Sequence, residues 1–567
     1  MNGKARRNRP FRAIRFLIPL CALPGMCYSQ QAAPSGNPLD SLPPVQKEPT
    51  EAVRAEIKPP PQPSQEILSQ VITPRQFDIV GVRSVPFAEV AKVFVPLAGQ
   101  SVTVARMVEV AAEVTKYYQE AGYALSFAFV PPQDFKDGVV QIVIVEGHIA
   151  RLEIEGNSGK SEALLRELAE PLLAEKPLRT ATFERQSQLM ARLPGVQATV
   201  SAQMPTTVDG ATTLRLITAH KPLIFSIGGE IRQPTSRAIA SLTANDVFAG
   251  GGQLQASTLL RSFDTERFLS LSYGQVVNTQ GTLVKASISD YRGVAPDSEQ
   301  LPGIDDITRQ RRMEVSVGHP LLLRARESLM LTGGLYGVDY SRTYEAQATG
   351  NALRDSQHIR VLFGQLAWSQ VEANAAHSAS VILAHGIRGA GAKAEFSNNF
   401  GAVLAPDDTR LDFLRLTFDA STRRRFAPSG WGGAILMAGQ YSPHWLPTPE
   451  RITFGASRFA RGYQAGQAAG DSGLGVGVEV NHSFPATWAW LKHWEPYLLY
   501  EAARTWMKQD GVVPARLRSL SLGLRFGDGR YYNADIAVSK PLGDVAMENP
   551  ERKVRLSLLL SYNLDVR

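Results

Sequence analysis

From Leu223 to the C-terminus, apolar and polar residues alternate along short segments that turn-forming residues separate. Leu520–Phe526 carries leucine or phenylalanine at every even position and serine, glycine or arginine at every odd one. The same pattern runs from Val554 to Leu564. Successive side chains of a β-strand point to opposite faces, so this period of two predicts strands with one apolar and one polar face.

About sixteen candidate strands, each about 10 residues long, follow one another in this region, as an outer-membrane barrel requires. A soluble sandwich also alternates, but its smaller core does not need so many strands. An even number of strands returns the chain to the side of the membrane where it started. We therefore predict a transmembrane antiparallel β-barrel of about 16 strands over residues 222–567.

Residues 72–147 show a different, mixed pattern that predicts an α+β unit. A strand at Phe77–Val82 precedes a segment in which apolar residues recur at helical spacing between Val104 and Tyr118. Two further strands follow, at Leu125–Val130 and at Val139–Gly147. The order is strand, two helices, then two strands.

Residues 148–221 repeat this order, which predicts two α+β units in series. We expect strands at Ile149–Asn157, near Val196–Gln203 and near Thr212–Thr218, and helices around Ser161–Leu173 and Phe183–Leu193. An open strand edge in such a unit can bind an extended peptide through backbone hydrogen bonds. A single α+β domain of unassigned purpose is the alternative.

The first 71 residues predict two further segments. Residues 1–29 combine basic residues, a short apolar run and small residues, which is typical of a secretory signal peptide cleaved near Ser29. Residues 30–71 are rich in proline and predict an extended linker, inside which Glu51–Ile57 has the composition of a short helix. The only two cysteines of the chain, Cys21 and Cys27, lie in the leader, so disulfides would not stabilise the exported protein.

The net charge of +7 does not indicate a nucleic-acid-binding protein. Six basic residues and no acidic ones lie in the proposed leader, which leaves +1 for the rest of the chain. A nucleic-acid site would need a concentrated basic surface, which this balance does not provide.

A long glycine-rich loop, residues 443–472, interrupts the alternating strands and contains Arg461-Gly462-Tyr463. Arginine is always charged and presents five N–H donors. A folded loop therefore places it where an acidic partner is available.

This loop resembles that of the ShlB/FhaC/HecB family, the outer-membrane pores of two-partner secretion, and similarities to the family cover essentially the whole chain after the leader. Further motifs that carry the resemblance are Gly122-Tyr123, Pro132 with Gly138, Glu146-Gly147 and Ser539–Leu542. The resemblance implies two periplasmic POTRA domains, at residues 72–147 and 148–221, ahead of the barrel. It also implies that an N-terminal helix can plug the pore and that the loop folds back into the barrel lumen.

The resemblance further implies a contact between the loop arginine and an acidic residue on the barrel wall. The family motif on that strand is aromatic-Asp-x-Gly, whereas this chain has Tyr500-Glu501-Ala502-Ala503. We expect Glu501 to face the lumen and to form an ion pair with Arg461 that latches the loop. An Arg461 that is merely solvated at the loop tip is the alternative. The predicted latch residues are Arg461, Gly462, Tyr463 and Glu501. The predicted substrate-binding residues of the POTRA domains are Gly122, Tyr123, Gln133, Gly138, Glu146 and Gly147.

No pattern in the chain predicts catalysis, a cofactor or a metal site. The glycine clusters at 250–252 and 386–391 do not open a helix after a strand, so they predict turns rather than phosphate-binding loops. The nine histidines are scattered without ligand spacing. Arg423–Arg425 is a run of charge that suits a solvated loop, the lumen or lipid headgroups.

The expected function is that of a monomeric transporter in the outer membrane of a Gram-negative bacterium, in contact with outer-membrane lipid and with no nucleic-acid partner. It would capture an unfolded exoprotein with its periplasmic POTRA domains and pass it through the barrel without ATP. The partner would be an adhesin, a haemolysin or a contact-dependent toxin. An insertase that assembles other barrels, a passive diffusion porin and, more remotely, a membrane-bound hydrolase are the alternatives.

Overall fold

The structure is a computed structural model that describes residues 56–58 and 68–566 except 136, 233–234, 261–264, 296–302, 401, 407–408, 457, 510 and 547–548. The proposed leader and most of the proposed linker lie outside these residues. The helix predicted at Glu51–Ile57 is wrong at its C-terminal end. Glu56 and Ile57 belong to strand β1 (Glu56–Lys58), which pairs with the second α/β unit described below.

The first α/β unit packs helices against a three-stranded sheet of order β3-β6-β5. Thr103 caps the long helix by accepting a hydrogen bond from the N–H of Arg106, and the buried face of this helix includes Met107, Val114 and Tyr118. Its elements are β2 (Val71–Ile72), β3 (Gln76–Val80), α2 (Phe87–Phe94), η2 (Val95–Leu97), β4 (Val102–Thr103), α3 (Val104–Glu120), β5 (Phe127–Phe129) and β6 (Val139–Val145).

The second α/β unit has the same plan, with a sheet of order β1-β8-β9-β7. Strand β1 therefore extends the outer edge of this sheet and runs parallel to β8. Its remaining elements are β7 (His148–Gly156), η3 (Gly159–Ser161), α4 (Glu162–Ala174), α5 (Thr180–Ala191), β8 (Val196–Gln203) and β9 (Ala211–His220). Within the described part of the chain, none of the helices is both long and apolar enough to cross a membrane.

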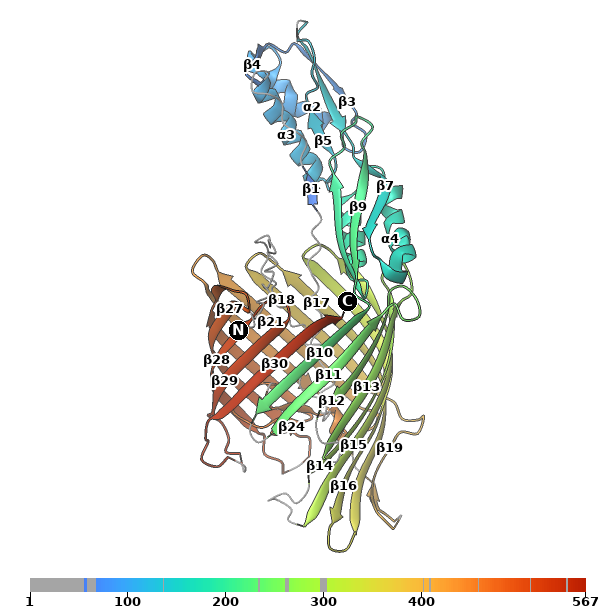
Figure 1. Cartoon of the computed structure of the whole chain (residues 1–567), viewed down its shortest axis with the longest axis vertical. Coiled ribbons are helices and arrows are strands. Elements are labelled where there is room, and N and C mark those ends of the chain that lie inside the picture. The colour runs from blue at the N-terminus through green and yellow to red at the C-terminus, as the bar shows by residue number, and fades with distance from the viewer. Residues whose placement is uncertain are drawn as a thin grey trace, which may run out of the picture.

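The C-terminal region is a closed antiparallel barrel of 16 strands, as the alternation predicted (Figure 1). Pairing of the first strand with the last, from Leu223 opposite Val566 to Arg232 opposite Ser557, closes it. The strands are β10 (Leu223–Arg232), β11 (Thr235–Asn245), β12 (Gly252–Leu259), β13 (Glu266–Val276), β14 (Leu283–Ala295), β15 (Ile304–Leu323), β16 (Glu327–Ala346), β17 (Ala352–Val371), β18 (Ala375–Gly386), β21 (Leu414–Phe426), β22 (Trp431–Tyr441), β25 (Ser472–His482), β27 (Leu491–Trp506), β28 (Arg516–Gly527), β29 (Tyr532–Pro541) and β30 (Arg555–Val566).

The predicted strand length of about 10 residues is wrong for one part of the wall. Strands β15, β16 and β17 each contain 20 residues. They continue beyond the rest of the barrel at the end opposite the α/β units, where Figure 1 shows them projecting. A short hairpin, β19 (Lys393–Asn398) and β20 (Val403–Pro406), pairs with the projecting part of β17. Alternation alone does not show where a strand leaves the apolar layer, so the extension was missed.

The two faces of the wall differ as a lipid-embedded barrel requires. On β28, Leu520 and Leu522 are exposed on the outer face, whereas Ser519 and Ser521 are buried inside. The inner face of β25 has the sequence Gly473, Gly475, Gly477, Glu479, and its outer face is mainly valine and leucine.

The second α/β unit is joined to the barrel by a buried carboxylate in the turn between β11 and β12. Asp246 accepts hydrogen bonds from the Ser161 hydroxyl at 2.9 Å, the Lys160 N–H at 3.2 Å and the Gly251 N–H at 3.0 Å. Gly250 passes so close that an added Cβ would lie 2.4 Å from the carbonyl oxygen of Lys160. These contacts fix the orientation of the unit against the barrel rim.

We expect Asp246→Asn to loosen this junction. Asparagine tolerates the left-handed backbone conformation of Asp246 (φ 54°), but it offers one acceptor oxygen where the carboxylate offers two. The buried donor left without a partner should cost about 1–3 kcal/mol. Double electron–electron resonance between spin labels at Glu170→Cys and Ala373→Cys should show a broader distance distribution than in the parent. Asp209→Asn, an exposed turn variant of the same unit, should not change it. An unchanged distribution in Asp246→Asn would show that the carboxylate does not hold the junction.

Candidate functional site

The loop between β22 and β25 folds into the barrel lumen and packs against the wall. It contains the short strands β23 (Ile452–Phe454) and β24 (Ala468–Gly470), which pair as a hairpin. Phe454 and Phe459 are buried against the inner face of β25. A Cβ at Gly475 would lie 2.8 Å from Phe459 and 2.9 Å from Phe454. Glycine on this face of β25 therefore makes room for the aromatic rings of the loop.

Arg461 lies at the tip of the loop and contacts two barrel strands, β27 and β29. Its backbone N–H donates to Glu501 Oε2 on β27 at 2.9 Å. Its guanidinium donates to the hydroxyl of Tyr497 at 2.6 Å, and it forms an ion pair with Asp535 on β29 at 3.4 Å. A hydrogen bond from Ser519 on β28 reaches Glu501 at 3.1 Å. The side chains of Arg461 and Asp535 are only 14% and 16% exposed, so water screens this contact weakly.

Gly462 and Tyr463 fix the tip against the C-terminal end of β29 and the residues that follow it. A Cβ at Gly462 would lie 2.7 Å from the backbone nitrogen of Pro541, so only glycine fits here without displacement. The buried Tyr463 hydroxyl donates to the carbonyl of Asp544 and accepts from the N–H of Gly543, both at 2.9 Å. The three residues of the triplet therefore each have a separate structural role.

A second arginine, Arg525 on β28, continues the charged cluster around the tip. It contacts Glu479 on β25 at 2.7 Å, Glu495 on β27 at 3.0 Å and Asp535 at 3.6 Å. Its guanidinium also lies 4.0 Å from the ring centroid of Tyr497. Asp535 is therefore shared between an arginine of the wall and the arginine of the loop.

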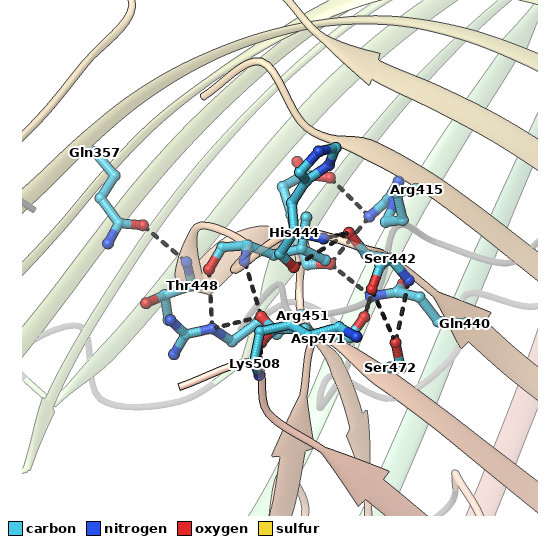
Figure 2. A network of polar contacts seen from close by, with 12 residues as sticks. Gln357, Arg415, Gln440, Ser442, His444, Thr448, Arg451, Asp471, Ser472 and Lys508 are labelled. Carbon is cyan, nitrogen blue, oxygen red and sulfur yellow. Dashed lines mark hydrogen bonds and ion pairs between the residues drawn. The ribbon is translucent and has the colours of Figure 1, made fainter. Parts of the chain in front are cut away.

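The root of the loop is held by a different polar network (Figure 2). Glu450 of the loop forms an ion pair with Arg415 on β21 at 2.7 Å, and both side chains are almost completely buried. The hydroxyl of Tyr336 on β16 donates to Glu450 at 2.9 Å. The N–H groups of Leu446 and Lys508 donate to the carboxylate of Asp471 at 2.8 and 2.6 Å. The loop is thus held both at its root and at its tip.

The structure brings the predicted latch residues together, with partners that the sequence did not indicate. Glu501 faces the lumen and contacts Arg461, and the hydrogen bond that joins them comes from the arginine backbone. Asp535, Tyr497 and the root pair Arg415–Glu450 were missed. An alternating strand contains many inward polar residues, and the sequence does not show which of them meets a loop from elsewhere in the chain.

Among the predicted POTRA residues, Glu146 is held inside the first unit. Its carboxylate accepts hydrogen bonds from the N–H groups of Arg83 and Ser84 at 2.8 and 2.7 Å, from the Ser84 hydroxyl at 2.7 Å and from the Tyr118 hydroxyl at 3.0 Å. Burial by itself would raise the pKa of Glu146, but the hydrogen bonds from Ser84, Arg83 and Tyr118 outweigh it and lower the pKa. Glu146 therefore ties the end of β6 to the segment that follows β3.

The other predicted residues of the first unit lie at three separate places. Gln133 exchanges hydrogen bonds with the backbone of Gln141 on β6 at 2.8 and 2.9 Å, so its side chain extends the ladder beyond β5. The carbonyl of Gly122, next to Tyr123, accepts a hydrogen bond from the backbone N–H of Thr180 of the second unit at 2.7 Å. Gly147 lies against the backbone and Cβ of Leu125. The Gly138 carbonyl accepts from the N–H of Arg75 at 2.6 Å.

The described residues contain no group of three or more histidine, cysteine, aspartate or glutamate side chains placed to hold a metal ion. The polar groups of the lumen instead pair with one another.

Comparisons with known proteins agree with this architecture. Residues 72–147 match the family described as POTRA domain, ShlB-type, and residues 325–526 match haemolysin secretion/activation protein ShlB/FhaC/HecB. The chain is 19% identical over 489 residues to the heme/hemopexin transporter protein HuxB of Haemophilus influenzae, covering 84% of each protein. It is 23% identical over 392 residues to the outer membrane transporter CdiB of Dickeya dadantii, covering 65% of each.

Two solved structures share the fold. CdiB from Escherichia coli superposes with a TM-score of 0.64 at 17% identity, over 89% of this chain and 93% of that one. BamA from Haemophilus ducreyi, lacking POTRA domains 1–3, gives 0.52 at 12% identity, over 87% and 100%.

The fold and the matches define an outer-membrane β-barrel protein with periplasmic POTRA domains. More specifically, the chain belongs to the ShlB/FhaC/HecB family of two-partner secretion transporters. The end of the barrel that carries the α/β units is therefore the periplasmic end, and the loop enters the lumen from the extracellular end.

We expect Arg461→Ala to release the loop tip. The change leaves the largely buried charge cluster without one cation, which should cost about 3 kcal/mol. In planar lipid bilayers the variant should show more frequent openings and larger current fluctuations than the parent, because the loop then occupies the lumen less firmly. Gln464→Ala, a neighbouring change in the same loop, should behave like the parent. Identical current traces for Arg461→Ala and the parent would contradict the latch.

We expect Glu146→Gln to destabilise the first POTRA domain in a pH-dependent way. A folded-state pKa below the ordinary value near 4.5 means that the carboxylate stabilises the fold above that value. The stabilisation is then lost as the pH falls through the folded pKa. At pH 7 the variant should lose about 1.5–3 kcal/mol. Thermal loss of the helical circular dichroism signal should occur at a lower temperature than in the parent, and the difference should shrink as the pH is lowered from 6 toward 3. A difference that stays constant with pH would argue against an ionised Glu146 as the cause.

Proposed function

We propose that this protein exports one large partner protein through its barrel to the cell surface, after its POTRA domains have captured the unfolded partner in the periplasm. The observation that carries the proposal is the loop, which lies in the lumen and is held there by non-covalent contacts that can be broken. A permanently open diffusion porin has no use for this arrangement.

The edge of the second POTRA sheet supports capture by strand addition. Glu56–Lys58 lies along β8, with Glu56 opposite Ser201 and Lys58 opposite Gln203. This edge therefore accepts an extended segment through backbone hydrogen bonds, which depend little on side-chain identity. An unfolded partner offers the same backbone groups.

The polar inner wall supports passage of an extended chain. Glycine, serine and paired charges predominate on the lumenal faces of β25 and β28, so a moving backbone meets hydrogen-bonding groups along these strands. The loop must first leave this path, which requires the contacts of Arg461 and Glu450 to break. Folding of the partner outside would supply direction without ATP, because it removes the unfolded form from the equilibrium.

The partner we propose is an adhesin, haemolysin or contact-dependent toxin. One relative is named as a heme/hemopexin transporter and another as the outer membrane transporter CdiB. The likeness to BamA concerns the fold alone, and the test below separates an exporter from an insertase.

The test is secretion of the long exported protein that we expect to be encoded beside this gene. Cells with the parent chain should release it. Arg461→Ala should lower the amount released about tenfold, because a loop without its tip contacts moves irregularly inside the lumen and obstructs the chain that passes. Gln464→Ala should not change the amount. The mechanism predicts that a deletion strain lacks the secreted protein but keeps a normal profile of other outer-membrane barrels. Loss of many barrels would favour the insertase, and unchanged secretion in Arg461→Ala would rule out the loop as the gate.

A further inference from the structure

An array of arginines lies on the outer face of the barrel wall formed by β13, β14 and β15. The outer face is identified by Leu269, Leu271, Ile288, Met313 and Val315, which are all exposed. On each of these strands, residues two apart share a face. Arg267, two residues before Leu269, therefore points outward toward the surroundings of the barrel. Arg292 also points outward, because it lies four residues after Ile288 on β14. Arg309 does so because it lies four residues before Met313 on β15.

These three arginines lie opposite one another in the strand register. Arg267 is the Cα partner of Arg292, and Arg292 is the Cα partner of Arg309. Like charges directly opposite each other destabilise a sheet. A row of three is therefore unfavourable unless an anion lies over it.

The acidic residues of the wall neutralise this row only in part. Asp290 lies 3.0 Å from Arg267 and 3.5 Å from Arg311. Within the residues that the structure describes, Arg292 and Arg309 have no ion pair. The Nε atoms of Arg267 and Arg292 are buried and have no hydrogen-bond partner among the described residues.

The next strands extend the same outward surface. Asp339 on β16 lies opposite Arg311 and pairs with Arg360 on β17 at 3.0 Å and with His358 at 2.9 Å. The residues named above comprise five arginines and two aspartates, which is an excess of three positive charges when the histidine is not counted. We call these residues the arginine belt: Arg267, Asp290, Arg292, Arg309, Arg311, Asp339, His358 and Arg360.

The arginine belt lies at the extracellular border of the apolar band. Strand β15 runs from the extracellular end toward the periplasm, and Arg309 and Arg311 precede Met313, Val315 and Val317 on the same face. At about 3.3 Å per residue, the guanidinium groups lie within roughly 15 Å of the apolar side chains below them. This is the depth at which the headgroups of the outer leaflet surround a barrel.

We propose that the arginine belt binds the phosphate groups of the phosphorylated glycolipid of the outer leaflet, lipid A. The planar guanidinium group of arginine binds phosphate through two parallel hydrogen bonds. The acyl chains would lie on the apolar residues immediately below, so the surface suits a lipid better than free phosphate. The proposal rests on the position of the chain in the outer membrane and does not depend on export.

The experiment is native mass spectrometry of the full chain, released from detergent micelles after incubation with defined lipids. The parent should retain bisphosphorylated lipid A, and Arg292→Gln with Arg309→Gln should lower the apparent affinity at least tenfold. The matched controls are Arg424→Gln alone and the same change added to the double variant. Arg424 is an exposed residue two before Phe426 on the outward face of β21, at the periplasmic end, and its loss should leave lipid A binding unchanged.

Three results would overturn the proposal. They are equal lipid A retention by the parent and the double variant, an equal loss in Arg424→Gln, and full displacement of lipid A by millimolar inorganic phosphate. A lipid lacking phosphate should be retained no better by the parent than by the double variant. Each protein should give the same barrel signal in circular dichroism, so that a folding failure is recognised. Because no secreted partner is present, the result tests the lipid site separately from the transport function.

Discussion

The hydrogen bonds between the first and last barrel strands are the constraint on which the rest of the structure depends. Inside a hydrocarbon layer each unpaired backbone group costs several kcal/mol, so a sheet that spans it must have no free edge. Ten register pairs between β10 and β30 remove that edge. Once the wall is closed, every strand has one face toward lipid and one toward the lumen. The even strand number also returns the C-terminus to the side where the POTRA domains attach.

The closed wall creates a lumen in which charged residues are tolerated only in pairs. Removing ions from water is expensive unless partners and hydrogen bonds compensate. Arg415 with Glu450, and Arg461 with Asp535, satisfy this condition by joining the loop to the wall. Arg525 adds a second cation beside Asp535 within the wall. The same residues that make the interior electrostatically acceptable therefore also decide where the loop rests.

Local periodicity is strong evidence for which elements form and weak evidence for which of them meet. Alternation predicted the barrel and its strand number, and helical spacing predicted α3. The predicted strand at 196–203 coincides with β8. The contact between Arg461 and Glu501 could be anticipated only through resemblance to a family. Asp535 was missed because it lies 74 residues further along the chain, and nothing in its own strand distinguishes it from other inward polar residues. The 20-residue strands were missed because alternation continues unchanged above the membrane.

The two ends of the inserted loop leave from β22 and β25, which are themselves hydrogen-bonded neighbours from Trp431 opposite His482 to Gln440 opposite Gly473. The loop is therefore an insertion between two paired strands, and its own short strands are not part of the barrel sheet. The loop can leave the lumen while all hydrogen bonds between the barrel strands stay intact. The free energy needed to move the loop is then set by its own hydrogen bonds, ion pairs and buried aromatic contacts, and it is independent of the free energy that keeps the barrel closed.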